Sequence, residues 1–344
     1  MINHLPDSPI DRSMDFPWGV PYGWYFVAYA DELKPGDVKP LRYFEREQVL
    51  FRNEDGEIGM LDAHCPHLGA HIGYGGKVHG KSVACPFHGW QFRPDGFCSA
   101  IPYAKKFPPI AKREPLLHSY PVKERANVIW AWYHPENIEP LFDVVDYPEY
   151  TDPNWNNEQR FEWIAYTSPQ EEAENAVDIA HFQFVHGAPG VPEGKAVYEG
   201  HIRRSRSDGR FEVENENGEI EVFESHVATI ANGAGQKITT LEAKLKVWLM
   251  VLLTPIKRNL TEIRFSYAYP KQEPGSAMEK EYFDYCQRIA GETGLLADLP
   301  IFNNKVHRTN PLIVDGDGDI LRYRQWFSQF YAGEDAPQQQ MAAE

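Results

Sequence analysis

Two pairs of metal-binding side chains stand close together in the first third of the sequence. The first pair is Cys65 and His67, separated by one residue, and the second is Cys85 and His88, separated by two. Seventeen residues lie between the two arms. Short arms of this kind can come from adjacent loops and meet at one site, so these four side chains are candidates for binding a metal or a cluster.

The composition of each arm favours an iron–sulfur cluster over zinc. Structural zinc sites usually pair Cys with Cys and His with His, as C-x2-4-C and H-x3-5-H. Here each arm carries one of each, as in a Rieske centre, where two thiolates hold one iron of a [2Fe–2S] cluster and two imidazoles hold the other. Neutral imidazoles raise the reduction potential to roughly −150 to +300 mV, against about −400 mV for plant-type clusters. The sequence therefore predicts a Rieske cluster that passes electrons onward, with structural zinc as the alternative.

The remaining cysteines give no sign of disulfides. Cys98 and Cys286 have no histidine at ligand spacing and are expected to be buried thiols. Four cysteines in 344 residues are too few for a disulfide-stapled secreted scaffold, and residues 1–16 contain no apolar signal segment. We therefore expect a cytoplasmic protein.

Charge and hydropathy exclude two classes of function. The net charge is −16, whereas a nucleic-acid-binding protein needs a basic face. The longest apolar run, Val247–Leu253, is far shorter than the roughly 20 residues of a membrane-spanning helix. The sequence thus predicts no nucleic-acid partner and no membrane span.

A second group of candidate ligands lies in a predicted helix. Ser168 and Glu171 form a capping box, and Gly187 is expected to stop the helix, so the spacing predicts one helix over residues 168–186.

Four polar residues of this predicted helix could act at a metal. Asn175, Asp178 and His181 are three residues apart and would share one helical face. His181 and His186 are five apart, which turns them about 140° away from each other on an ideal helix. Both can reach one metal only if the helix unwinds or bulges, and we expect this near Gln183–Val185. The alternative is a set of solvated residues on a helix surface.

A carboxylate from elsewhere must complete such a site, because two histidines and one carboxylate form the facial triad of non-haem Fe(II) oxygenases. Asp298 lies in the otherwise apolar stretch 295–301, where a buried carboxylate is costly unless it is paired or metal-bound. Its rivals Asp315, Asp317 and Asp319 belong to a Gly-Asp loop that lacks the terminal Glu of an EF-hand and is expected to be a plain turn. We favour Asp298 as the third ligand.

The surrounding pattern indicates an α+β protein of two domains. Short apolar runs between glycines and prolines from Trp24 to about His134 indicate a small all-β domain, and residues 135–157 are the expected linker. Beyond it, the sequence predicts the helix described above, then strands, then a second helix. The strands are expected at 219–230, 237–254 and 261–269 and the second helix at 277–290.

These patterns divide the chain into an N-terminal domain, residues 1–150, and a C-terminal domain, residues 151–344. The tail Gly333–Glu344 has a biased composition and is expected to be disordered.

The two motifs, C-x-H…C-x-x-H and N-x-x-D-x-x-H-x4-H, resemble those of the Rieske oxygenase α subunits, and the resemblance extends over nearly the whole chain. Flanking stretches are similar to the steroid-acting branch, which contains the 3-ketosteroid 9α-hydroxylase oxygenases and the cholesterol 7-desaturases. These stretches are Gly23–Tyr25, Cys85–Phe92, Ile101–Ala104, Asp298–Lys305 and Asp315–Tyr331.

The resemblance implies a fold and a set of roles. The fold is an all-β Rieske [2Fe–2S] domain followed by a helix-grip catalytic domain with an antiparallel sheet and a deep apolar cavity. The resemblance assigns Asp298 as the carboxylate ligand of a mononuclear iron. It assigns Asp178 as the bridge between the two centres and Asn175 as a residue close to the iron.

The expected activity is that of a terminal oxygenase. A separate NAD(P)H-dependent reductase with flavin and ferredoxin centres would supply electrons, which would pass from the cluster through Asp178 and His181. Iron held by His181, His186 and Asp298 would use O2 to hydroxylate, or less often desaturate, a hydrophobic substrate. The resemblance implies a steroid or sterol, with an aromatic or other apolar small molecule as the alternative.

Distance argues for an oligomer. A domain of about 150 residues has a radius of gyration near 15 Å, so centres in separate domains of one chain would lie too far apart for fast electron transfer. A head-to-tail ring would bring one subunit's cluster beside the next subunit's iron. The resemblance implies a homotrimer.

Two other classes of protein compete with an oxygenase. An electron carrier would need only residues 61–97 and would leave the long C-terminal part unexplained. A zinc-dependent binding or structural protein is the third class, and it would be colourless, whereas a Rieske centre is red-brown.

Overall fold

The computed structural model describes most of the chain, namely residues 10–214, 220–291, 294–333 and 336. The tail that is expected to be disordered, Gly333–Glu344, lies outside the described residues except for Gly333 and Ala336. Contacts divide the chain into an N-terminal unit, Trp24–Val144, and a C-terminal unit, which comprises the described parts of Met1–Gly23 and Val145–Glu344. The division into domains at residues 150 and 151 stays a prediction.

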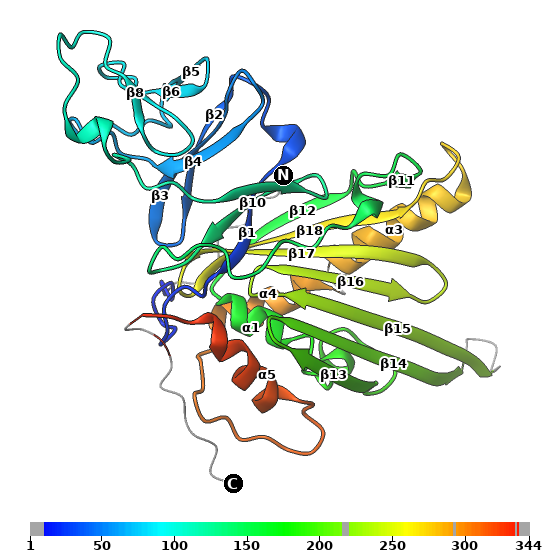
Figure 1. The fold of residues 1–344 in the computed structure, drawn as a ribbon. Helices are drawn as coiled ribbons and strands as arrows, with labels where there is room; N and C mark the ends of the chain where they lie inside the picture. The colour runs from blue at the N-terminus through cyan, green and yellow to red at the C-terminus, as the bar shows by residue number, and fades with distance from the viewer. Residues whose placement is uncertain (1–9, 215–219, 292–293, 334–335, 337–344) are drawn as a thin grey trace. The chain divides into compact units, whose positions relative to one another are not determined.

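The N-terminal unit is built from short antiparallel strands and two single helical turns, as predicted for a small all-β domain. The strands form three sheets with the orders β1-β10-β9, β2-β3-β4 and β5-β6-β7-β8 (Figure 1). Their bounds are β1 Gly23–Tyr29, β2 Val38–Tyr43, β3 Arg46–Arg52, β4 Ile58–Asp62, β5 Lys77–His79, β6 Ser82–Ala84, β7 Gln91–Phe92, β8 Cys98–Ala100, β9 Val122–Arg125 and β10 Val128–Tyr133.

The core of the N-terminal unit includes two of the candidate ligands. Cys65 and Cys85 belong to the same cluster of buried side chains as Phe51, Leu61 and Phe92. These three apolar side chains have no exposed surface. The loops that carry the cysteines therefore rest directly on the core, which restricts the positions of both thiols.

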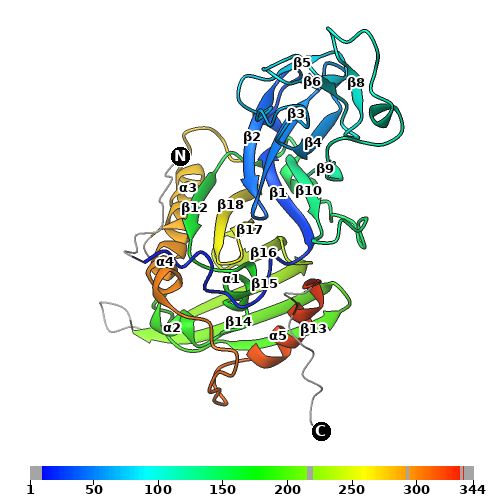
Figure 2. The same ribbon diagram turned by 90° about the vertical axis from the view of Figure 1, so that its left-hand side faces the viewer.

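The C-terminal unit is built on one antiparallel sheet of eight strands in the order β11-β18-β17-β16-β15-β14-β13, with β12 also paired to β18 (Figures 1 and 2). Each strand pairs with a neighbour in sequence or with β18, so most of the sheet is a meander. The bounds are β11 Trp155–Asn156, β12 Arg160–Ala165, β13 Glu193–Glu199, β14 Ile202–Glu214, β15 Ile220–Asn232, β16 Gln236–Glu242, β17 Lys246–Lys257 and β18 Leu260–Pro270.

The single strand predicted at 237–254 is wrong, because β16 and β17 are two strands joined by a turn. The Ala243 N–H donates to the Leu245 carbonyl at 3.0 Å, and Lys246 Nζ lies 3.5 Å from Glu242 Oε2 across the turn. The apolar pattern of β16 continues into β17, so the hydrophobic pattern alone does not indicate the turn between them.

Two strands, β13 and β14, were not predicted from the sequence. Their outward residues include Arg204, Arg206 and Asp208, which are exposed, so the segment reads as polar. The inward residues are small or polar, such as Ser205 and Ser207, and they lack the apolar alternation by which a strand is recognised.

Helices supply the other wall of the C-terminal unit. Ser276 caps α3 by accepting from the Glu279 N–H, and α3 has the bounds predicted for the second helix. Helix α3 contacts β18 and α4 contacts β12 (Figure 2). Among the described residues, no helix combines the length and apolar character that a membrane crossing requires. The bounds are α1 Pro169–Glu174, α2 His181–Phe184, α3 Ala277–Ala290, α4 Leu295–Asn304 and α5 Ile320–Phe327.

The single helix predicted over residues 168–186 is also wrong. The chain forms α1, leaves helical geometry between Glu174 and His181, and then forms the short α2. Ser168 caps α1 through the Glu171 N–H at 3.2 Å, as predicted, while the Glu171 side chain, the other half of the predicted capping box, pairs with Lys305 and His307. One interruption precedes the two histidines and was not expected, while α2 itself ends at Phe184, so helical geometry is also lost between the histidines, near Gln183–Val185 as predicted.

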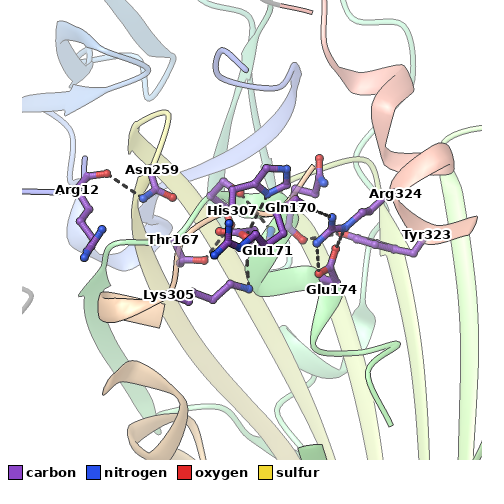
Figure 3. A network of polar contacts seen from close by, with 12 residues as sticks. Arg12, Thr167, Gln170, Glu171, Glu174, Asn259, Lys305, His307, Tyr323 and Arg324 are labelled. Carbon is purple, nitrogen blue, oxygen red and sulfur yellow. Dashed lines mark hydrogen bonds and ion pairs between the residues drawn. The ribbon is translucent and has the colours of Figure 1, made fainter. Parts of the chain in front are cut away.

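Helix α1 is anchored by three buried carboxylates, each of which meets a cation from a different part of the chain. Figure 3 shows the contacts of Glu171 and Glu174. The pairs that define this anchoring cluster are Glu171 with Lys305 and His307, Glu172 with Lys237, and Glu174 with Arg324. An isolated buried carboxylate costs several kcal/mol. The cluster therefore holds α1, and the segment that follows it, in one position.

The core of the N-terminal unit provides a stability prediction. We expect Leu61→Ala to lower the free energy of unfolding by about 2–5 kcal/mol, because it leaves a cavity in a fully buried site. Ile110→Ala is the control, since Ile110 is 54% exposed and its loss should change stability by less than about 0.5 kcal/mol. Urea unfolding followed by circular dichroism measures both, and equal effects of the two substitutions would contradict the assignment of this core.

The anchoring cluster provides a pH prediction. Burial alone would raise the pKa of Glu171, but the hydrogen bond with His307 and the Lys305 ammonium hold it below its ordinary value of 4.5. The stability that the carboxylate contributes is thus fully present above pH 4.5 and is lost as the pH falls through the lower folded-state pKa. We expect Glu171→Gln to reduce the free energy of unfolding by about 1–3 kcal/mol at pH 7, with a smaller difference at acid pH.

The measurement is urea unfolding of wild type and variant between pH 7 and pH 3.5. Glu273→Gln serves as the control, because Glu273 is exposed. A difference between wild type and Glu171→Gln that stays constant over this range would show that the carboxylate charge does not anchor α1.

Candidate metal centres

The two cysteine–histidine arms fold into loops of nearly the same shape. In each loop the cysteine N–H donates to the carbonyl five residues on, that of Ala70 or Trp90, at 2.9 and 2.8 Å. The glycine four residues after each cysteine, Gly69 or Gly89, donates back to the cysteine carbonyl and has a φ of 75° or 69°. Glycine adopts this conformation without strain, and it allows both loops to curl round one point.

The four predicted cluster ligands meet in like pairs. The Cys65 and Cys85 thiols are hydrogen-bonding neighbours, and the His67 and His88 ring centroids are 4.7 Å apart. His67 Nδ1 is buried and has no hydrogen-bond partner among the described residues. A [2Fe–2S] cluster needs this separation of thiolates from imidazoles, whereas zinc would draw all four into one tetrahedron. The residues therefore fit a Rieske cluster, and their assignment as its ligands stays a prediction.

The thiols and the imidazoles differ in exposure. Cys65 and Cys85 are each 3% exposed, while His67 and His88 are half-buried. Burial, and after it the neighbouring Cys85, raises the pKa of Cys65 to about 12, so a thiolate forms here only beside a cation. Trp90 stacks on His67 with ring centroids 5.0 Å apart. The imidazole side is therefore the side open to a redox partner.

The other cysteines are buried, as predicted. Cys98 lies in the apolar core of the N-terminal unit and Cys286 has no exposed surface. Burial raises the pKa of the Cys286 thiol to about 12.

The three predicted ligands of the C-terminal unit lie together. One ligand atom each from His181, His186 and Asp298 can be chosen so that all lie within 4.8 Å of one another. His186 Nε2 is 3.4 Å from Asp298 Oδ2, and the two imidazole centroids are 5.0 Å apart. In the part of the chain that the structure describes, this is the only such group of three or more side chains. Two imidazoles and one carboxylate fit non-haem Fe(II), although the assignment stays a prediction.

The end of α2 at Phe184 leaves His186 outside the helix, so its ring can lie beside that of His181. Gly318 packs against the segment between α1 and α2 with a φ of +78°, and a Cβ at this position would stand 2.2 Å from the Val177 carbonyl oxygen. His181 Nδ1 is in close contact with the Asp178 carbonyl, which leaves Nε2 for a metal. Burial lowers the pKa of His181 and so favours the neutral imidazole that metals bind.

Asp298 lies on α4 and is 6% exposed. Burial, and then the nearby Glu172, raises the pKa of Asp298 to about 7, while Lys237 and a hydrogen bond from Asn175 act in the opposite direction. A divalent cation at this site would favour the ionised carboxylate. The local electrostatics thus suit a cation.

Asn175 and Asp178 do not share a helical face with His181, because the chain between them is not helical. Asn175 nevertheless contacts Asp298, as a residue close to a metal should. Asp178 is half-buried and its Oδ1 accepts from the His181 N–H at 3.4 Å. Its role as an electron bridge stays a prediction.

The rival carboxylates have other partners. Asp317 Oδ2 accepts from the Val314 N–H at 2.8 Å, and Asp319 Oδ2 lies 3.7 Å from Arg322 Nη1. Asp315 and Asp317 lie in a turn, as predicted, and none of the three loop carboxylates belongs to the group of ligand atoms described above.

A cavity of about 330 Å³ opens beside the three candidate ligands, all of which line it. One wall consists of residues of β13 to β18, and the other of residues of α1 to α4, of the segments beside α2, and of Gly318 and Asp319. The side chains on β17, β18 and the helices are mostly apolar, namely Leu249, Val251, Phe265, Tyr285, Ile289, Leu295, Val177 and Phe182.

A buried ion pair of this cavity was not predicted from the sequence. Glu172 and Lys237 form an ion pair at 2.8 Å, and both line the cavity beside Asp298. The alternation along β16 contained the signal, because it makes Lys237, Thr239 and Leu241 share the inward face of the strand.

Comparisons with known proteins match both units of the chain. The family model for the Rieske [2Fe-2S] domain matches residues 23–121, and that for the 3-ketosteroid 9alpha-hydroxylase C-terminal domain matches residues 131–331. The N-terminal unit is therefore a Rieske [2Fe–2S] domain, and the predicted α+β architecture with an antiparallel catalytic sheet is confirmed.

The curated relatives include steroid-acting enzymes. A cholesterol 7-desaturase from Xenopus laevis is 33% identical, with 91% of this chain and 72% of the relative covered. A probable 3-ketosteroid-9-alpha-monooxygenase, oxygenase component, from Rhodococcus rhodochrous is 29% identical, with 90% and 79% covered. The second relative is by name an oxygenase component.

Solved structures share the fold. Dicamba monooxygenase bound to 3,6-dichlorosalicylic acid superposes with a TM-score of 0.70 at 17% identity and covers 90% of this chain and 96% of its own. A Pseudomonas putida protein solved with caffeine gives a TM-score of 0.67 at 18% identity, with 88% and 89% covered. One dicamba monooxygenase structure contains non-haem iron. The chain belongs to the Rieske oxygenases, in the branch defined by the 3-ketosteroid 9α-hydroxylase C-terminal domain, and is an oxidoreductase.

Proposed function

We propose that this chain is the terminal oxygenase of a Rieske monooxygenase that hydroxylates or desaturates a steroid or sterol. The observation that supports it is the convergence of His181, His186 and Asp298 on the wall of a mainly apolar cavity. The relatives named for cholesterol and 3-ketosteroid substrates support the substrate class. The domain boundary near residue 150 and a cytoplasmic location belong to the same proposal.

The residues of the two centres have separate tasks in this proposal. Cys65, His67, Cys85 and His88 hold the [2Fe–2S] cluster, and His181, His186 and Asp298 hold a mononuclear iron. When bound, the iron supplies the redox chemistry by which O2 attacks an unactivated C–H bond. The protein positions this iron with two neutral imidazoles and the carboxylate, which Asn175 orients by a hydrogen bond.

The cavity orients the substrate and excludes water. Its apolar side chains on β17, β18, α3 and α4 favour a hydrophobic molecule. Such a molecule places its C–H bonds beside the carboxylate and imidazoles of the candidate iron site, which line the same space. Three aromatic rings of the lining, Phe182, Phe265 and Tyr285, favour an aromatic compound as the second candidate substrate class.

Electrons reach the iron site through Asp178 in this proposal. Asp178 contacts both the backbone and the ring of His181. We propose that a head-to-tail homotrimer brings one subunit's cluster imidazole to the next subunit's Asp178. The electron donor is an NAD(P)H-dependent reductase with flavin and ferredoxin centres.

The function is tested by coupled turnover. The purified chain with both metal centres and a surrogate reductase is expected to consume O2 in proportion to an oxidised steroid product. O2 uptake and product mass are measured with a 3-ketosteroid, a sterol and a chlorinated benzoate. Coupled uptake with the benzoate alone would favour the aromatic alternative, and uptake with none of the three would contradict the proposed substrate classes.

Removal of the candidate carboxylate ligand should remove one iron. Asp298→Ala is expected to reduce the iron content from about three to about two per chain, with the visible absorbance of the cluster unchanged. Asp315→Ala, at an exposed carboxylate of the neighbouring loop, is the control and should retain all the iron. Full iron content in Asp298→Ala would exclude Asp298 as a ligand.

The bridging role of Asp178 is tested by reoxidation of the cluster. Asp178→Asn should retain both metal centres, because the backbone carbonyl that contacts the His181 ring is unchanged, but slow turnover by roughly 100-fold, because the carboxylate proposed as the bridge to the cluster is lost. The reduced cluster of this variant should be reoxidised slowly by O2 in the presence of substrate. Asp317→Asn is the control, and reoxidation of Asp178→Asn at the wild-type rate would disprove the bridge.

A further inference from the structure

Three hydroxyl side chains form a row across one wall of the cavity. Ser205 on β14 pairs in register with Thr229 on β15, which pairs in turn with Thr239 on β16. All three line the cavity. Residues in register on adjacent antiparallel strands point to the same face, so the row is continuous and lies on the inner face of the sheet.

The middle of this row has an unused hydrogen-bond donor. Thr229 Oγ1 and Thr239 Oγ1 are 3.0 Å apart, so one hydroxyl donates to the other. A pair of hydroxyls carries two hydrogens, and this contact uses one. The described residues offer no further acceptor to the pair, and Thr229 and Thr239 are only 4% and 8% exposed. One O–H is therefore left to donate within the cavity.

Lys237 adds a charged donor beside this pair. It precedes Thr239 by two residues on β16, so both side chains point to the inner face about 7 Å apart. The ammonium carries three N–H groups, and its one hydrogen bond to the described residues is with Glu172 Oε2 at 2.8 Å. Lys237 is 7% exposed, so the remaining N–H groups cannot rely on bulk water.

The β17–β18 side of the same sheet offers the cavity no comparable groups. Leu249 and Val251 continue the same two rows on β17, since they pair in register with Thr239 and Lys237. Phe265 on β18 pairs with Val251 and is also apolar. On the sheet wall, the donors that line the cavity therefore lie on β13–β16, whereas the helical wall adds Tyr285 and Asn175 beside the candidate iron ligands.

We infer that Lys237 and the Thr229–Thr239 pair bind a hydrogen-bond-accepting oxygen of the substrate, a ketone carbonyl, and thereby orient the molecule in the cavity. A carbonyl oxygen has two lone pairs and can accept from both donors. The inference rests on the proposed steroid function and adds to it a preference between its two substrate classes, the ketosteroids over the hydroxysterols.

A hydroxyl fits this wall less well than a ketone. A substrate O–H brings a donor to a place where an ammonium and a hydroxyl already donate, and it must find its acceptor in a threonine oxygen or in Glu172, which the Lys237 ion pair already engages. Sites built to hydrogen-bond a group reject analogues that lack it, because the buried donors are then left unpaired. The ketone, the alcohol and the hydrocarbon should therefore bind in that order.

Binding of steroids with one oxygen or none tests the inference without turnover. Equilibrium dialysis of the purified chain, with its cluster and iron but without reductant, gives the dissociation constants of 5α-androstan-3-one, 5α-androstan-17-one, 5α-androstan-3β-ol and 5α-androstane. At least one ketone should bind about tenfold more tightly than the hydrocarbon and about threefold more tightly than the alcohol.

Two variants assign the effect to this wall. Thr239→Val keeps the shape of the side chain and should weaken binding of the preferred ketone about three- to tenfold, with hydrocarbon binding changed less than about twofold. Ser207→Ala removes another cavity hydroxyl, which lies one row away opposite Val227, and should leave the ratio of ketone to hydrocarbon affinity unchanged.

The outcomes separate this inference from the proposed function. Equal binding of ketones and hydrocarbon by wild type would overturn the inference and leave the steroid substrate class standing. Loss of affinity for ketone and hydrocarbon alike in Thr239→Val would also overturn it, because a structural role predicts that result. Binding of none of the four steroids would overturn the steroid proposal itself, and the inference with it.

Discussion

Three carboxylates are buried on a helix of six residues, and the geometry of the catalytic unit depends on how their charges are matched. Helix α1 can lie against the sheet only when its cations are in place, because a buried carboxylate without a partner costs several kcal/mol. The cations come from β16, from α5 and from the segment after α4, and Figure 3 shows the last two. The residues that follow α1 are therefore positioned only when the sheet and the C-terminal segments of this unit have folded round α1.

The charges of Glu172 and Lys237 also favour binding of a metal ion and of a substrate oxygen in the cavity. Glu172 and Lys237 belong to the anchoring cluster and also line the cavity beside Asp298. Burial and the negative charge of Glu172 raise the pKa of Asp298 and so favour a cation at the triad. On the other side of the ion pair, the Lys237 ammonium and the threonine pair favour an acceptor oxygen. The Glu172–Lys237 ion pair thus serves two sites: its carboxylate lies beside the candidate iron ligand Asp298, and its ammonium belongs to the proposed carbonyl site.

The two centres illustrate different ways of bringing ligands together. In the Rieske domain, each arm is a local loop closed by its own hydrogen bonds and a glycine, and the two loops rest on one apolar core. In the catalytic unit, Asp298 comes from a helix that is more than a hundred residues from the histidines in sequence. The first arrangement is encoded over a few residues, and the second depends on the whole sheet.

The sequence alone determined whatever is local. A Rieske site was predicted from the spacing of Cys65, His67, Cys85 and His88. The N-cap at Ser276 predicted α3, and the alternation of apolar residues predicted β18. Asp298 was predicted as a ligand because it is an acid in an apolar stretch. Only the tertiary structure decided the interruption before His181, the turn between β16 and β17, the polar strands β13 and β14, and the inward position of Lys237. These features depend on strand register and on charges paired across long sequence separations, which no local pattern records.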